Sequence, residues 1–181
     1  MKNYTLDREN TLLLMIDIQE RLAPAIHNGD QIVDKNRILL TAMKELQMKV
    51  IHTEQYPKGL GKTLPELAEL IAASPHEKVM FSAYNDEVRD NIFSSGKKNI
   101  LVTGMETHVC VFQTVRDLLE GKYNVFVITD GVGSRTYENY RNALDMMQEM
   151  GAVITNTETV LFDLIKTAGT PDFKIVSKLV K

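Results

Sequence analysis

The strongest constraint on the fold is a repeated alternation of short strand-like runs with amphipathic helical segments. Between the runs, apolar residues recur every three to four positions, which is the spacing of helices with one buried face. Strands joined by crossover helices form parallel sheets covered by helices on both faces. The sequence therefore predicts a three-layer α/β/α fold with a six-stranded, mostly parallel sheet. The predicted strands are residues 11–16, 50–53, 79–81, 99–103, 125–129 and 152–155, and the predicted helices are residues 31–46, 86–95, 108–120 and 138–150.

The length and composition are those of a single globular domain. The chain has 181 residues, of which 44% are hydrophobic and 25% are charged, so it can bury one well-packed core. No internal repeat or linker divides it, and we expect one domain over residues 1–181. Residues 55–63 form the longest turn-rich stretch, and because they follow a strand we interpret them as a candidate lid.

The charge and the cysteine content limit the partners and the compartment. The formal net charge is -3, and Lys and Arg are scattered, so we expect neither a nucleic acid nor an anionic membrane as partner. No apolar run approaches the roughly 20 residues that span a bilayer. A single cysteine cannot form an internal disulfide, and residues 1–9 do not resemble a signal peptide. These features favour the cytoplasm.

The only cysteine, Cys110, lies where a strand pattern breaks at Gly104 and becomes a helical one. That position puts the thiol in the first turn of a helix, where the helix dipole favours an anion. We therefore predict a lowered thiol pKa and a nucleophilic sulfur. The alternative is that Cys110 is a small buried apolar residue without chemical function.

A second candidate is Asp17, which directly follows the apolar run at residues 11–16. Ligands of open parallel sheets bind at the carboxyl ends of the strands, beside the point where the strand order reverses. A carboxylate at that place is expensive to bury without a partner, and burial would raise its pKa into the range of a general acid–base group. Asp17 could instead be a helix cap.

Three segments together resemble the isochorismatase-like cysteine hydrolases over about residues 10–165. They are Leu13-Leu-Met-Ile-Asp17-Ile-Gln19, Lys78-Val-Met-Phe-Ser82-Ala-Tyr84 and Val102-Thr-Gly-Met-Glu-Thr-His-Val-Cys110. Three motifs in family order are more specific than any one of them. The resemblance implies a catalytic triad of Asp17, Lys78 and Cys110. In it Asp17 exchanges the thiol proton, Lys78 orients Asp17, and Cys110 attacks the substrate.

The resemblance also implies a non-proline cis peptide bond, which maps to Met105 and Glu106. Its use would be to turn backbone N–H groups, including that of Cys110, toward the oxyanion of a tetrahedral intermediate. Gly104 would supply the backbone freedom nearby.

One departure from the family concerns metal binding. The nicotinamidase branch has an Asp-x-His metal motif after the second strand, whereas this chain has Glu54 and Tyr56 at those positions. The four histidines, His27, His52, His76 and His108, show no paired spacing. We therefore expect no metal and no cofactor.

Residues 53–61 look most like the uncharacterised isochorismatase-domain subgroup, so the resemblance names no substrate. We expect a small-molecule substrate and a homo-oligomer, a dimer or a tetramer. The candidate substrate-binding residues are Gln19, Tyr56, Phe81 and Tyr84, although such aromatic residues also occur in cores.

The predicted activity is hydrolysis of a small amide-type C–N bond through a thioester on Cys110. One alternative is a catalytically weak binding or redox-responsive protein in which Cys110 is oxidised. The other is an isochorismatase-type ether hydrolase, a reaction that the family performs without a nucleophilic cysteine.

Overall fold

The computed structural model describes residues 4–181 and is built around one six-stranded sheet, all of whose strand pairs are parallel. The strand order is β3-β2-β1-β4-β5-β6. The strands are β1 (Thr11–Ile16), β2 (Val50–Gln55), β3 (His76–Lys78), β4 (Asn99–Met105), β5 (Asn124–Gly133) and β6 (Val153–Thr155). The order reverses between β1 and β4, which puts the expected ligand position at their carboxyl ends.

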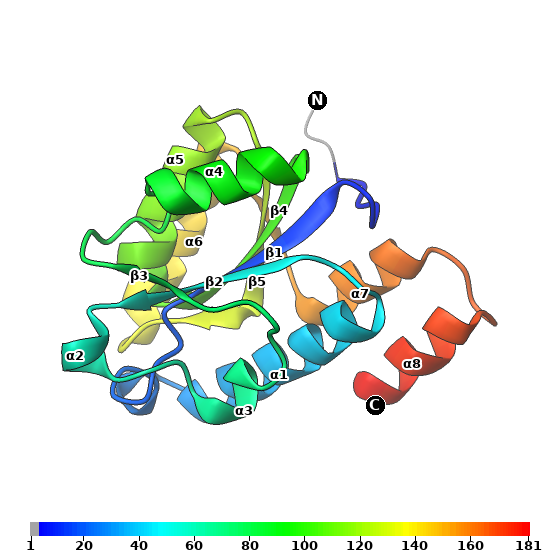
Figure 1. Cartoon of the computed structure of the whole chain (residues 1–181), viewed down its shortest axis with the longest axis horizontal. Coiled ribbons are helices and arrows are strands. Elements are labelled where there is room, and N and C mark those ends of the chain that lie inside the picture. Colours follow the sequence, from blue (N-terminus) through cyan, green and yellow to red (C-terminus); the bar gives the residue numbers. More distant parts are fainter. Residues whose placement is uncertain (1–3) are drawn as a thin grey trace.

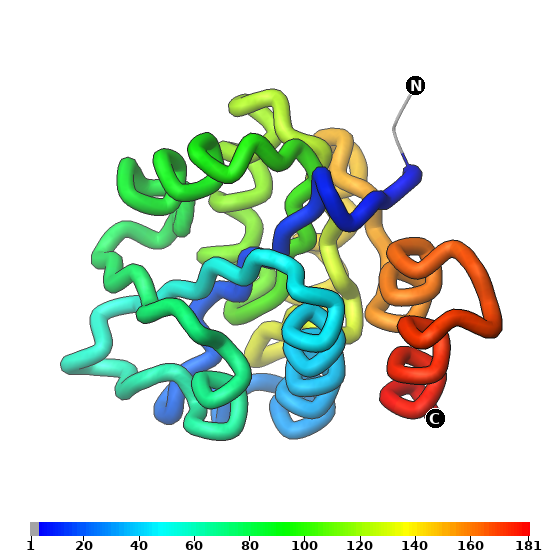
Figure 2. The backbone as a smooth tube through the Cα atoms, turned by 45° about the vertical axis from the view of Figure 1, so that its right-hand side comes forward, coloured from blue at the N-terminus to red at the C-terminus, as the bar shows by residue number. Residues whose placement is uncertain are grey.

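Helices cover both faces of the sheet, which confirms the predicted three-layer α/β/α architecture (Figure 1). On one face lie α4 (Asp86–Ser95), α5 (Phe112–Glu120) and α6 (Tyr137–Met150). On the other lie α1 (Gly29–Glu45), the single turn α3 (Pro65–Ala68), α7 (Thr157–Ile165) and α8 (Pro171–Leu179). Figure 2 shows α7 and α8 side by side next to α1. The short elements are η1 (Ala23–Ala25), α2 (Pro57–Leu60) and the π-helical turn η2 (Thr107–Val111).

The two faces of the sheet bury two separate apolar clusters. Every residue of β1 is buried, as expected for a central strand covered on both sides. Successive side chains of a strand point to opposite faces, so Leu13 and Met15 pack under α1 while Leu12 and Leu14 pack under α5. No helix of the described residues is long and apolar enough to cross a membrane.

One predicted strand is wrong. Strand β3 is His76–Lys78, not residues 79–81, because residues 76–78 form the parallel ladder with β2. The apolar residues Val79, Met80 and Phe81 lie beyond the strand and are 79%, 56% and 53% exposed. Apolar character alone does not distinguish a buried strand from an exposed apolar loop.

The helices α7 and α8 were not predicted, although each begins with a recognisable cap. The side chain of Asn156 accepts the N–H of Thr159, and that of Thr170 accepts the N–H of Phe173. Pro171 occupies the first turn of α8, where its missing N–H costs nothing.

Candidate active site

Asp17 leaves the sheet immediately after β1, with a left-handed backbone at φ 54°. Its side chain is fully buried, and Thr53 of β2 donates its hydroxyl to Asp17 Oδ1 at 2.7 Å. No helix begins at Asp17, since η1 starts only at Ala23, so the helix-cap interpretation is wrong. Burial raises the pKa of the Asp17 carboxyl, while Lys78, Thr53 and Cys110 act in the opposite direction.

Lys78 is the last residue of β3 and forms a buried ion pair with Asp17. The Nζ atom lies 2.6 Å from Asp17 Oδ2, and both side chains have no exposed surface. The same ammonium donates to Gln55 Oε1 at 2.6 Å and to the carbonyl of Phe81 at 3.0 Å. A buried ammonium needs these partners, because burying it without them would cost several kcal/mol.

Cys110 lies in the π-helical turn η2, which leads from β4 into α5, and is only 6% exposed. Burial and the negative charge of Asp17 raise the pKa of the Cys110 thiol to about 12, although Lys78 and a backbone hydrogen bond from Glu106 act against the rise. The predicted lowering of the thiol pKa is therefore wrong. Burial and the neighbouring carboxylate of Asp17 both disfavour the thiolate, so the ground state of Cys110 is the protonated thiol.

Strand β4, which leads into the turn with Cys110, ends in an unusual backbone conformation. Gly104 has a φ of 127°, and a Cβ at this position would lie 2.0 Å from the carbonyl oxygen of Ile16, so only glycine fits. The peptide bond between Met105 and Glu106 is cis. The carbonyl of Glu106 accepts the N–H groups of Val109 and Val111, which fastens the turn around Cys110.

The predicted substrate-binding residues occupy different places. Tyr56 and Phe81 are 55% and 53% exposed. The backbone of each contacts Lys78: the N–H of Tyr56 donates to the Lys78 carbonyl, and the carbonyl of Phe81 accepts from Lys78 Nζ. Gln19 is fully buried, and its amide donates to the carbonyls of Gln55 and Gly61 and accepts the N–H of Gln55. The Gln19 side chain therefore uses its hydrogen bonds to hold the loop after β2 in place.

Tyr84 does not fit the predicted substrate contact. Its ring packs edge-on against Tyr123, with centroids 6.1 Å apart. Its hydroxyl lies beside Gly121, at the end of α5 opposite to Cys110. The Tyr84 side chain therefore contributes to the packing under α5, and the aromatic pattern in the sequence did not distinguish this from a pocket.

The turn-rich segment predicted as a lid is fastened to the segment after β1. The N–H groups of Glu20 and Arg21 donate to the carbonyls of Lys62 and Leu60, and Leu64 N–H donates to Ile18. With the two amide bonds from Gln19, this network leaves the segment little freedom to swing, so the lid interpretation is not supported.

Gln55 is a site residue that the sequence argument missed. Its Oε1 accepts from Lys78 Nζ, and its Nε2 donates to the carbonyl of Val79 at 2.7 Å. Gln55 thereby helps to orient the ammonium that pairs with Asp17. The rule that functional residues gather at the carboxyl ends of strands would have found it, had the strand at residues 50–53 been extended by two residues.

The positions that bind metal in the nicotinamidase branch have other contacts in this chain. Glu54 is buried, and its Oε1 accepts both the N–H and the hydroxyl of Thr63. Tyr56 is 55% exposed. Across residues 4–181 there is no cluster of three or more His, Cys, Asp or Glu side chains spaced to hold a metal ion. His108 contacts Ser134, with 2.9 Å between Nδ1 and Oγ.

Comparison with known proteins places these residues in a family context. A family model described as an isochorismatase domain matches residues 11–159. Isochorismatase family protein 1B of Dictyostelium discoideum is 36% identical over 179 residues, covering 96% of this chain and 87% of that protein. Isochorismatase domain-containing protein 2 of Danio rerio is 35% identical, covering 97% and 89%.

Solved structures share the fold. The structure of the MAR1 ribonuclease from Caenorhabditis elegans has a TM-score of 0.92 and 36% identity, and the match covers 97% of this chain and 92% of that chain. The YcaC gene product of Escherichia coli, described as an octameric hydrolase of unknown specificity, has a TM-score of 0.91 at 23% identity, covering 99% and 90%. At 23% identity, the match to the YcaC gene product shows a shared fold and nothing about function.

Proposed function

The chain belongs to the isochorismatase family, and from this premise we propose that it is a cysteine hydrolase that cleaves a small amide-type C–N bond. The observation that carries the proposal is the buried cluster of Asp17, Lys78 and Cys110 at the carboxyl edge of the sheet. A nucleophile beside a carboxylate that is itself held by a cation is the arrangement of a catalytic triad.

In the first half-reaction, Cys110 Sγ attacks the carbonyl carbon of the amide while Asp17 takes the thiol proton. A C–S bond forms and the carbonyl oxygen becomes an oxyanion. The C–N bond then breaks, Asp17 gives its proton to the departing nitrogen, and the acyl group stays on Cys110 as a thioester. The raised pKa of the thiol makes this base necessary, because the free thiolate is scarce at neutral pH.

In the second half-reaction, Asp17 takes a proton from water as the hydroxyl attacks the thioester carbon. The C–S bond breaks, the acid product leaves, and Asp17 returns the proton to Cys110. Asp17 thus serves as base and acid in alternation. The ion pair with Lys78 stabilises the ionised carboxylate of Asp17, with Gln55 and the Phe81 carbonyl fixing the position of Lys78.

The oxyanion site belongs to the same proposal. The backbone around the cis peptide between Met105 and Glu106 and the N–H of Cys110 would stabilise the developing charge, a contribution of about 3 kcal/mol per donor in other enzymes. Tyr56 and Phe81, at the edge of the site, would contact the part of the substrate that is not cleaved.

The redox alternative is less well supported. A redox-sensing cysteine is accessible and of low pKa, whereas the Cys110 thiol is buried and its pKa is raised to about 12. A cysteine without a disulfide partner is compatible with the cytoplasm, which we propose as the compartment.

A second candidate function is RNA cleavage, because the Caenorhabditis elegans protein with 36% identity is called a ribonuclease. The chemistry of the site favours amide hydrolysis over RNA cleavage. Phosphodiester cleavage calls for groups that neutralise a phosphate, while the ammonium at this site is already committed to Asp17, Gln55 and the Phe81 carbonyl.

The test is a screen of small carboxamides and carbamoyl compounds, with an unstructured RNA in parallel and the Cys110→Ala variant as the matched control. We expect release of ammonia or amine from at least one amide by the parent protein and none by the variant. Cleavage of RNA that persists in Cys110→Ala, without any amide turnover, would overturn the proposal.

A further inference from the structure

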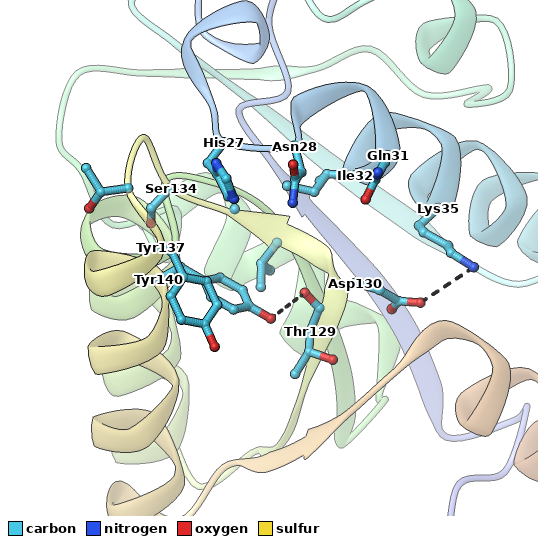
Figure 3. A pocket seen from close by; sticks show the side chains of 13 residues that line it. His27, Asn28, Gln31, Ile32, Lys35, Thr129, Asp130, Ser134, Tyr137 and Tyr140 are labelled. Carbon is cyan, nitrogen blue, oxygen red and sulfur yellow. Dashed lines mark hydrogen bonds and ion pairs between the residues drawn. The ribbon is translucent and has the colours of Figure 1, made fainter.

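A cavity lies at the carboxyl end of β5, apart from the cluster around Cys110. Its volume is about 280 Å³, and neither Asp17, Lys78 nor Cys110 lines it. Figure 3 shows the start of α1 on one side, two tyrosines of α6 on the other, and β5 between them. The last strand pair of β5 and β6 joins Ile128 to Thr155, so the part of β5 that lines the cavity extends beyond β6.

One wall of the cavity is aromatic. The rings of Tyr137 and Tyr140 lie next to each other, with centroids 6.0 Å apart. The Tyr140 hydroxyl donates to the Thr129 carbonyl at 3.0 Å (Figure 3), which fixes that ring. Tyr137 is 57% exposed. Ile32 from α1 and Val132 from β5 add apolar surface. Such a wall accepts a flat ring by stacking.

The wall formed by α1 carries carboxamides that can read the edge of such a ring. Asn28 and Gln31 both line the cavity, and Asn28 does not use its side chain to cap α1 although it directly precedes the helix. A carboxamide offers one acceptor and two donors in a plane. It therefore pairs with a ligand that has donors and acceptors side by side.

The charges in the cavity compensate each other. Lys35 Nζ lies 4.0 Å from Asp130 Oδ2, and Asp130 Oδ1 also accepts the N–H and the hydroxyl of Thr157, both at 2.9 Å. A carboxylate ligand would face Asp130 and a cationic ligand would face Lys35. The paired charges therefore favour a ligand without net charge.

We propose that this cavity is a second ligand site, which binds a neutral planar heteroaromatic molecule with the hydrogen-bonding edge of a nucleobase. The ring stacks on Tyr137 and Tyr140, and its edge pairs with Asn28 and Gln31. At about 280 Å³ the cavity is at the small end of ligand pockets and suits a single ring system. This site does not depend on the activity proposed for Cys110.

The wall of this cavity continues into the turn that carries Cys110, because Ser134 lines the cavity and its hydroxyl contacts His108 of η2 at 2.9 Å. The test must therefore distinguish the cavity from the catalytic site. We use adenine, cytosine and uracil as probes, with benzoate as a flat ring of similar size that carries a charge.

Binding is measured by titration calorimetry on the parent protein, on protein alkylated at Cys110, and on three variants. We expect at least one base to bind with a Kd at or below about 1 mM, and benzoate to bind at least about tenfold more weakly. Tyr137→Leu should weaken binding about tenfold, as the loss of a stacking partner does. Gln31→Leu, at an exposed position of α1, should weaken it about threefold or more.

Phe93→Leu is the matched control, since Phe93 is an exposed aromatic residue on α4, distant from the cavity in sequence and fold. It should leave the Kd unchanged, as should alkylation of Cys110. No saturable binding of any base, equal binding of benzoate, equal loss in Phe93→Leu, or loss of binding on alkylation would each overturn the proposal. If Tyr137→Leu fails to fold, Gln31→Leu decides.

Discussion

Lys78 and Asp17 form an ion pair in which both side chains are wholly buried. Removing one partner of a buried ion pair commonly costs about 3–5 kcal/mol, since the remaining charge is left uncompensated. Replacing both partners is often far less costly. The pair therefore allows the catalytic and the structural role of Asp17 to be separated.

We predict that Asp17→Asn lowers the melting temperature clearly, although asparagine tolerates the left-handed backbone at this position. Turnover should fall by about two to four decades, as for the loss of a general acid–base group. Adding Lys78→Met should restore much of the stability and none of the activity. Thermal melts and kcat on the screened substrate measure both; recovery of activity in the double variant would contradict the role of Asp17.

Asp17→Asn should lower the pKa of the Cys110 thiol, although the same substitution lowers the activity. Because the charge of Asp17 raises the pKa of Cys110 while Lys78 lowers it, Asp17→Asn removes the raising charge and leaves the lowering one. We predict that the variant forms thiolate at lower pH than the parent, whose thiol pKa is about 12. Ultraviolet absorbance of the thiolate against pH measures this. Identical titrations of the two proteins would show that Asp17 does not act on the sulfur.

At the residue scale, the sequence allowed the aspartate, the lysine and the cysteine to be chosen from their motifs, and the structure brings them together. It did not allow the pKa of Cys110 to be predicted, because that depends on burial and on the distance to a carboxylate more than 90 residues away in the chain. Tyr84 and Gln19 were misread for a similar reason. Their partners, Tyr123 and the loop after β2, become neighbours only in the folded chain.

At the scale of elements, the position of Cys110 depends on how α5 is joined to the segment after β3. Thr114 of α5 donates its hydroxyl to the Cys110 carbonyl at 2.6 Å and accepts the N–H of Ala83 at 2.8 Å. It is fully buried. This single side chain links the turn that carries the thiol to the segment that follows Lys78.

Thr114→Val should therefore destabilise the protein by about 1–3 kcal/mol, the cost of leaving a buried N–H without an acceptor. The matched control is Thr41→Val, because the partly exposed Thr41 of α1 makes the same type of bond, to the Arg37 carbonyl at 2.7 Å, and its loss should change stability by no more than about 0.5 kcal/mol. Urea unfolding measures both. Equal effects of the two substitutions would refute the link.

The alternation of strands and helices was enough to predict the sheet and its main crossover helices. It failed at β3, where the ladder with β2 uses His76–Lys78 and the more apolar residues 79–81 remain exposed. Short edge strands are defined by pairing with a neighbour, which a single sequence does not display. The helices α7 and α8 lie after the last strand, where the alternation gives no signal and only the caps at Asn156 and Thr170 mark them.

At the scale of the whole molecule, the strand order puts the three site residues on one edge. Asp17 follows β1 and Cys110 follows β4, the two strands between which the order reverses, while Lys78 ends the outermost strand β3, so all three lie at carboxyl ends of parallel strands. The topology thus explains how residues separated by dozens of positions form one buried cluster.

The exposed residues Val79, Met80 and Phe81 bear on the proposed homo-oligomer. Three consecutive apolar side chains at the surface are typical of an interaction site. We predict a mass in solution of two or four times 20.5 kDa by light scattering, and partial dissociation in Val79→Asp. Phe93→Asp, at a 76% exposed position on α4, is the matched control. A monomeric parent protein would refute the oligomer.

The central claim is that Cys110 carries the acyl group of the substrate during turnover. The direct measurement is intact-protein mass spectrometry after rapid acid quenching, with an amide or activated acyl substrate from the screen, followed by peptide mapping. We predict one acyl increment, confined to the peptide that contains Cys110 and absent from Cys110→Ala, which is also inactive. Steady turnover by Cys110→Ala at the rate of the parent protein, with no acyl group on Cys110 at any time, would contradict the account.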